Sequence, residues 1–76
     1  MSVQTHHRTL QLGSTGDDVK GVQKSLNVHG FGPLAEDGIF GPKTESAVKK
    51  YQSNHGLTPD GIIGPKTWHQ LDLDAQ

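Results

Sequence analysis

Apolar side chains recur at helical spacing in three stretches of the chain, which are separated by glycine, proline and acidic residues. Residues three or four positions apart lie on one face of an α-helix, so each stretch would present one apolar face to a core. The pattern predicts helices over about 17–29, 42–55 and 65–71. The apolar positions are Val19, Val22 and Leu26 in the first stretch, Ala47, Val48 and Tyr51 in the second, and Trp68 and Leu71 in the third.

An eight-residue segment occurs twice beside these stretches. Residues 37–44 are DGIFGPKT and residues 60–67 are DGIIGPKT, 23 positions apart. Asp-Gly favours a tight turn, and Gly-Pro favours a helix start, because proline there already has a helical φ and lacks only an N–H that would be unpaired. The repeat therefore predicts two structured Asp-Gly loops, each of which starts a helix. The loop residues expected to point inward between the helices are Ile39, Phe40, Ile62 and Ile63.

A weaker similarity links the first two helices. Residues 19–23 are VKGVQ and residues 48–52 are VKKYQ, and both predicted helices end in His-Gly. The sequence therefore repeats part of a helix as well as a loop.

The flanking segments complete the predicted architecture. Leu10 and Leu12 alternate ahead of a glycine-containing turn and predict a short extended arm against the core, with Ser14 or Thr15 as the N-cap of the first helix. Residues 1–9 are predicted to be a flexible lead-in, 10–71 the folded domain and 72–76 a flexible tail. The expected fold class is all-α, a compact three-helix bundle with two structured Asp-Gly loops.

Composition excludes several classes of protein. The chain has 76 residues, of which 30% are hydrophobic, and no cysteine, so disulfides, thiolate metal sites and thiol nucleophiles are excluded. A net charge of −1 without a basic run argues against nucleic acid as a partner. The sequence contains no membrane segment, and its N-terminus lacks the apolar core of a signal peptide. We expect a monomer.

The sequence offers little for catalysis, and we expect neither an enzyme nor a cofactor. His29, His55 and His69 each stand alone without metal-ligand spacing, so they are interpreted as exposed or helix-end residues, and no metal site is predicted. The acidic pairs are sequence neighbours, which separates their side chains. A binding surface is the remaining function class.

The helix starts of the two loops are the candidate binding positions. Glycine caps leave backbone N–H groups without a side-chain partner, and Lys43 and Thr44 at the first turn would suit a carboxylate. Thr44 could equally satisfy local backbone groups, as could Thr67. For Asp37 and Asp60 the favoured interpretation is that each locks its own turn.

Together these residues resemble a known family. They resemble the type 1 peptidoglycan-binding domain family, three-helix modules of bacterial and phage wall hydrolases. The residues that carry the resemblance are Leu12-Gly13-Ser14, Gly16, Asp18-Val19-Lys20, Gln23, Leu26, the two DGI-x-GPKT copies, and the final Trp68 and Leu71. The likeness covers about residues 10–71. It implies non-catalytic binding to bacterial cell-wall peptidoglycan that targets a linked or associated hydrolase, in the wall or the extracellular or periplasmic space. By analogy, the groove-forming candidates are Asp37, Phe40, Lys43, Thr44, Tyr51, Gln52 and Asp60.

Alternatives stay open at this point. The same fold could serve as a protein-docking or structural module of a cell-wall or phage assembly, and a minimal hydrolase is the least favoured reading. The segment GSTG at 13–16 departs from the GPKT of the two later copies, so ligand contacts are expected around the later loops. Whether glycan or stem peptide is recognised is undecided by the sequence.

Overall fold

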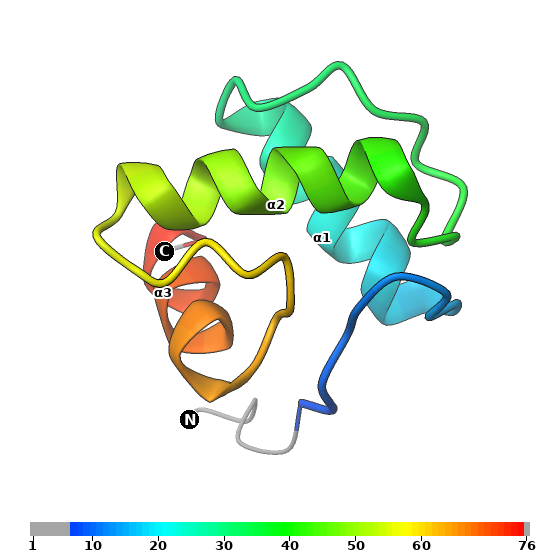
Figure 1. Ribbon diagram of the computed structural model, residues 1–76. Helices are drawn as coiled ribbons and strands as arrows, with labels where there is room; N and C mark the ends of the chain where they lie inside the picture. The colour runs from blue at the N-terminus through cyan, green and yellow to red at the C-terminus, as the bar shows by residue number, and fades with distance from the viewer. Residues whose placement is uncertain (1–6, 76) are drawn as a thin grey trace.

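A computed structural model describes residues 7–75 and shows three α-helices in that range (Figure 1). They are α1 (Asp17–Val28), α2 (Pro42–Asn54) and α3 (Pro65–Asp74). The described residues form no β-strand, only two isolated antiparallel bridges. The predicted all-α, three-helix fold class is confirmed. None of these helices has the length and apolar composition needed to span a bilayer.

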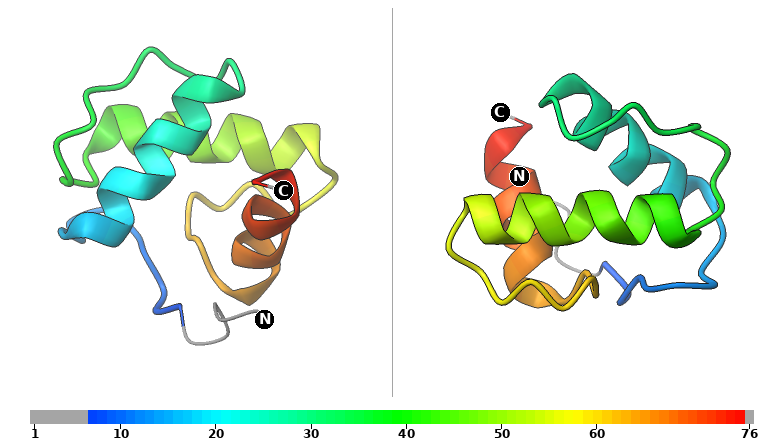
Figure 2. Two further views of the ribbon diagram at one scale, coloured as in Figure 1. Left: turned by 180° about the vertical axis from the view of Figure 1, so that it is seen from behind. Right: turned by 45° about the horizontal axis from the view of Figure 1, so that its top comes forward.

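The helices cross one another around a single core. α2 crosses α1, and α3 packs near the C-terminal end of α2 (Figures 1 and 2). All the apolar positions predicted from helical spacing are buried, as are three residues from outside the helices. The core consists of Leu10, Val19, Val22, Leu26, Phe40, Ala47, Val48, Tyr51, Ile63, Trp68 and Leu71.

α1 and α2 end in the same way. After α1, Gly30 N–H donates to the Asn27 carbonyl and Phe31 N–H donates to the Leu26 carbonyl, which is the Schellman pattern. After α2, Gly56 and Leu57 make the equivalent bonds to Ser53 and Gln52. The cap residues are His29 and His55, so these two histidines lie at helix ends as predicted.

The prediction for the start of α1 is wrong. Gly16, not Ser14 or Thr15, is the N-cap, and no side chain caps this helix within the part of the chain that the structure describes. The Ser14 hydroxyl instead accepts a hydrogen bond from Gln11 N–H at 3.0 Å and closes the turn before the helix. Ser14 is used in that turn and Thr15 pairs with Ile39, which leaves Gly16 as the N-cap.

Two of the four loop residues predicted to point inward point outward. Phe40 and Ile63 are buried, but Ile39 is 56% exposed and Ile62 is 38% exposed. The reason is the extended backbone of each loop, in which successive side chains point to opposite sides. Only one residue of each apolar pair can face the core.

The N-terminal arm runs across both loops. Leu10 forms a bridge with Ile63 of the second copy, and Thr15 forms a bridge with Ile39 of the first. Leu10 is buried as predicted, whereas Leu12 is exposed, because a turn interrupts the arm after Gln11. The arm thereby joins the two repeated segments to each other.

The predicted flexible ends differ in part from the structure. Residues 1–6 of the predicted lead-in lie outside the described residues. Arg8 is in contact with the domain, since its guanidinium pairs with the Asp18 carboxylate at 2.7 Å and its carbonyl accepts from Trp68 Nε1–H at 2.8 Å. Asp72 to Asp74, assigned to the tail, form the last turn of α3.

Candidate functional site

The first Asp-Gly loop (loop 1, residues 37–41) is held by one buried side chain of α1, Gln23. Its Nε2 donates to the Ile39 carbonyl at 2.9 Å, to the Thr44 hydroxyl at 3.1 Å and to Asp37 Oδ1 at 3.2 Å. Its Oε1 accepts from Gly38 N–H at 2.9 Å. One carboxamide thus connects the turn, the extended segment and the first turn of α2.

The second loop (loop 2, residues 60–64) is held in the same way by Gln52 of α2. Nε2 donates to the Ile62 carbonyl at 2.9 Å, to the Thr67 hydroxyl at 3.0 Å and to Asp60 Oδ1 at 3.2 Å. Oε1 accepts from Gly61 N–H at 2.9 Å. The weak helix similarity in the sequence therefore corresponds to a repeated structural role of glutamine.

The number of residues between the glutamine and the loop that it binds differs between the two copies. Gln23 precedes Asp37 by 14 residues, whereas Gln52 precedes Asp60 by 8. In the longer connection, Asn27 pairs with both the N–H and the carbonyl of Leu34, at 2.8 and 2.9 Å. This pairing holds the additional residues of the longer connection in place, so that loop 1 reaches its glutamine in the same geometry as loop 2.

Each loop aspartate closes its own turn, which confirms the favoured interpretation of these residues. Asp37 Oδ1 accepts from Ile39 N–H at 3.0 Å, and Asp60 Oδ1 accepts from Ile62 N–H at 2.9 Å. Donation by Ile39 N–H, supported by Gln23, lowers the pKa of Asp37 below its ordinary value, because these donors favour the charged carboxylate. The aspartates are therefore held in place by the loops.

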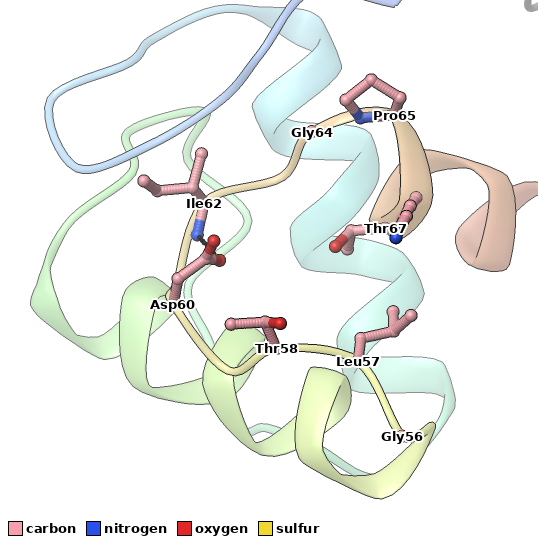
Figure 3. Close-up of a pocket in the computed structure, with 9 residues that line it drawn as sticks. Gly56, Leu57, Thr58, Asp60, Ile62, Gly64, Pro65 and Thr67 are labelled. Atoms are coloured by element: carbon pink, nitrogen blue, oxygen red, sulfur yellow. Dashed lines mark hydrogen bonds between the residues drawn. The ribbon is translucent and has the colours of Figure 1, made fainter.

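A concave pocket lies beside each loop. The loop-1 pocket, about 430 Å³ in volume, is lined by Gln23 and residues 34, 35, 37, 39 and 41–44. The loop-2 pocket, about 440 Å³, is lined by residues 56–58, 60, 62 and 64–67. Figure 3 shows the chain from Gly56 to Thr67 curving around the second hollow, with the Asp60 carboxylate beside the backbone N of Ile62.

The residues proposed from the sequence divide into two groups. Asp37, Lys43 and Asp60 are exposed and line the pockets. The other four are buried: Phe40, Thr44, Tyr51 and Gln52. The side-chain polar groups of the last three bond inside the domain, although Thr44 also borders the loop-1 pocket.

Sequence reasoning missed several lining residues. Lys66 matches Lys43 at the repeat spacing, and Ile62 matches Ile39. The 23-residue period was the signal that could have identified them.

The starts of α2 and α3 form one wall of each pocket. The N-caps are Gly41 and Gly64, proline follows, and no side-chain cap bond is made at either helix among residues 7–75. The positive end of each helix dipole therefore borders a pocket. Within the same range, no group of three or more His, Asp or Glu side chains is arranged to hold a metal ion.

Comparison with known proteins finds relatives of this chain in sequence and in structure. A model of the peptidoglycan binding domain family matches residues 15–71. The zinc D-Ala-D-Ala carboxypeptidase of Streptomyces albus G is 43% identical over 67 residues, covering 83% of this chain and 26% of that enzyme. A relative from Kitasatospora aureofaciens is 47% identical, and the chain covers 61% of it. The chain therefore spans less than two thirds of the length of these curated relatives.

Solved structures agree with the sequence comparison. The SleB N-terminal domain superposes with a TM-score of 0.88 at 34% identity, covering 93% of this chain and 97% of that one. The Burkholderia AP3 phage endolysin superposes with a TM-score of 0.81 at 45% identity, covering 87% of this chain and 25% of the endolysin. In the endolysin, the matched region is thus one part of a longer protein.

Proposed function

This chain belongs to the peptidoglycan binding domain family, and we propose that it binds bacterial cell-wall peptidoglycan through the pockets beside its two Asp-Gly loops. The single observation that carries this proposal is the pair of preformed pockets, each lined by the repeated motif. Lys43 and Lys66 line them, while the buried Gln23 and Gln52 fix the loops from inside the domain. A fixed scaffold with exposed, chemically mixed walls is suited to binding without rearrangement.

Burial narrows the candidate contacts. Phe40, Thr44, Tyr51 and Gln52 are buried, so in this proposal they support the loops. Asp37, Lys43 and Asp60 are exposed and, with Lys66, supply the contacts. A change at Thr44 would therefore alter loop stability, whereas a change at Lys43 would alter the pocket surface alone.

The test is co-sedimentation with purified insoluble sacculi. We expect the chain to pellet with sacculi and to stay in the supernatant with cellulose. Lys43→Ala combined with Lys66→Ala should weaken binding roughly twofold to thirtyfold, because each solvated charge contributes about 0.2–1 kcal/mol and the pair therefore about 0.4–2 kcal/mol.

The matched control removes the same charge elsewhere. Lys20→Ala combined with Lys50→Ala changes two exposed lysines that line neither loop pocket, and it should bind like the wild type. Recovery of the wild-type chain in the supernatant with sacculi would refute wall binding, and equal weakening by both double variants would refute the pocket assignment.

The second part of the proposal concerns an enzyme that is linked to or associated with this module. The carboxypeptidase and the endolysin are longer than this chain, and the matched module covers about a quarter of each. We propose that the module holds a linked or associated wall-degrading enzyme at the wall, where tethering raises the local enzyme concentration. A protein-docking role would instead appear as sedimentation that soluble muropeptides fail to inhibit.

A further inference from the structure

The two loop pockets are copies of each other. Eight lining positions of the loop-1 pocket, shifted by 23 residues, are lining positions of the loop-2 pocket, and the two volumes are about 430 and 440 Å³. The glutamine networks behind the pockets agree in partner types and, within 0.1 Å, in distances. Any ligand group that fits one pocket therefore meets nearly the same surface in the other.

Each pocket has an exposed aliphatic side chain at the same place. Ile39 and Ile62 occupy equivalent positions and are exposed, while the adjacent loop residues Phe40 and Ile63 are buried. Half-buried Leu34 and Leu57 line the same two hollows. The repeated aliphatic wall suits a ligand with small apolar side chains.

Charges of both signs border that wall. The hydrogen bonds of Asp37 and Asp60 within the described residues use Oδ1, which leaves Oδ2 free to accept from a ligand. Lys43 and Lys66 supply a cation to the same pockets. Such a surface complements a short peptide that carries both amino and carboxylate groups.

The aromatic residues argue for peptide rather than sugar. Recognition of a sugar ring commonly uses an exposed aromatic face, but neither set of lining residues, within 7–75, contains Phe, Tyr or Trp. Phe40 and Tyr51 are in the core, and Phe31 packs edge-on against Tyr51. Trp68 borders a different pocket, whose lining contains no residue of either loop, and there its ring stacks on His7. The stem peptides of peptidoglycan, with their alanine methyls and charged dicarboxylic and diamino residues, match the pockets better than its glycan does.

We infer that the module carries two ligand seats, one in each loop pocket, and that each seat takes one stem peptide of the wall. This inference rests on the proposed wall binding and adds the ligand class and the number of sites. On a polymer with many stem peptides, binding of one stem peptide in the first seat makes binding of another in the second seat an intramolecular step. Binding to sacculi should then exceed binding to a free stem peptide, by roughly 10²–10⁴-fold where both seats engage.

The test is an amide chemical-shift titration of the ¹⁵N-labelled chain with a soluble tetrapeptide stem, compared with peptide-free glycan strands. We expect two separate groups of shifting amides, around residues 37–44 and 60–67, a stoichiometry of two peptides per chain, and no shifts with glycan. Ile39→Ala with Lys43→Ala should abolish the first group alone, and Ile62→Ala with Lys66→Ala the second alone. These side chains are exposed, so the variants should fold like the wild type, and the rest of their amide spectra should match the wild-type spectrum.

The matched control is Val28→Ala with Lys20→Ala, which removes an exposed aliphatic and a lysine from α1 and should leave both groups intact. A single group of shifts at one equivalent, or shifts with glycan alone, would overturn the two-seat inference while sedimentation with sacculi still supported wall binding. Failure of the wild-type chain to sediment would overturn the proposed function and the inference together.

Discussion

At the scale of single residues, the two buried glutamine side chains hold the repeated loops in place. Gln23 and Gln52 each donate and accept within one loop, so every polar atom of the side chain is paired. Among the described residues, no buried side-chain polar atom lacks a partner. Buried polar groups are tolerated only on that condition, and each glutamine is therefore a sensitive point of the fold.

Gln52→Leu should destabilise the domain by about 2–4 kcal/mol, because it leaves the Gly61 N–H and the Ile62 carbonyl without their partner. Urea unfolding followed by the fluorescence of Trp68 measures the loss. Lys50→Ala, at an exposed position of the same helix, is the control and should stay within about 0.5 kcal/mol of the wild type. Equal effects of the two changes would contradict the structural role of Gln52.

The Tyr51 hydroxyl donates to Asp74 at the end of α3 and lowers the pKa of that carboxyl below its ordinary value. The folded pKa thus lies below the unfolded value of about 3.9, so this pair stabilises the fold above that pH and less as pH falls through the folded pKa. Asp74→Asn should therefore destabilise the domain most near neutrality.

Urea midpoints measured from pH 6 to pH 2 test this expectation. The difference between wild type and the Asp74 variant should shrink as the pH falls toward and below about 4. Asp18 and Asp37, whose pKa values are also lowered, remain in the variant and should preserve part of the acid sensitivity. A difference that is constant with pH would exclude the Asp74 carboxylate as its source.

At the scale of elements, the two loops are equivalent in sequence but differ in their neighbours. Gly38 and Gly61 both adopt φ of +76°, where a side chain is strained. A Cβ at Gly38 would lie 3.0 Å from the backbone oxygen of Gly16, whereas one at Gly61 would meet the flexible side chains of Glu45 and Lys49. The loops should therefore tolerate substitution unequally.

Gly61→Ala should destabilise the domain by about 1–2 kcal/mol through backbone strain, and Gly38→Ala should destabilise it more, because the Gly16 backbone cannot move aside as a side chain can. Gly21→Ala is the control, since this helical position has open space and should gain about 0.5–1 kcal/mol. Thermal unfolding of the three variants ranks them. A larger loss for Gly61 would contradict the packing argument.

The same elements show how far the sequence could predict this fold. Helical spacing identified all three apolar faces, and the DGI-x-GPKT repeat identified both loops, because these signals are local. The exposure of Ile39 and Ile62 follows from extended backbone, and the Gln23 contact spans a 14-residue connection. The sequence does show a similarity between residues 19–23 and 48–52. It does not show which groups Gln23 and Gln52 contact, because those contacts form only when the helices pack.

At the scale of the whole molecule, the N-terminal arm joins parts that are distant in sequence. Leu10 exchanges two backbone hydrogen bonds with Ile63, at 3.1 and 2.8 Å, and Gly13 N–H donates to the Phe40 carbonyl at 2.9 Å. The Arg8 carbonyl accepts from the indole of Trp68 in α3. The arm therefore links both loops and the last helix in a domain too small to have a large reserve of stability.

Leu10→Ala tests that link against a closely matched position. Leu10 is 0% exposed and Leu12 is 53% exposed, although the two leucines lie in the same arm two residues apart. Leu10→Ala should destabilise the domain by about 2–5 kcal/mol, since it leaves a cavity between the arm and the core, whereas Leu12→Ala should change stability by less than about 0.5 kcal/mol. Because small domains have about 5 kcal/mol of total stability, the Leu10 variant should be partly unfolded at 37 °C. Circular dichroism melts of both variants measure this, and similar melting temperatures would show that the arm contributes little to holding the two repeats together.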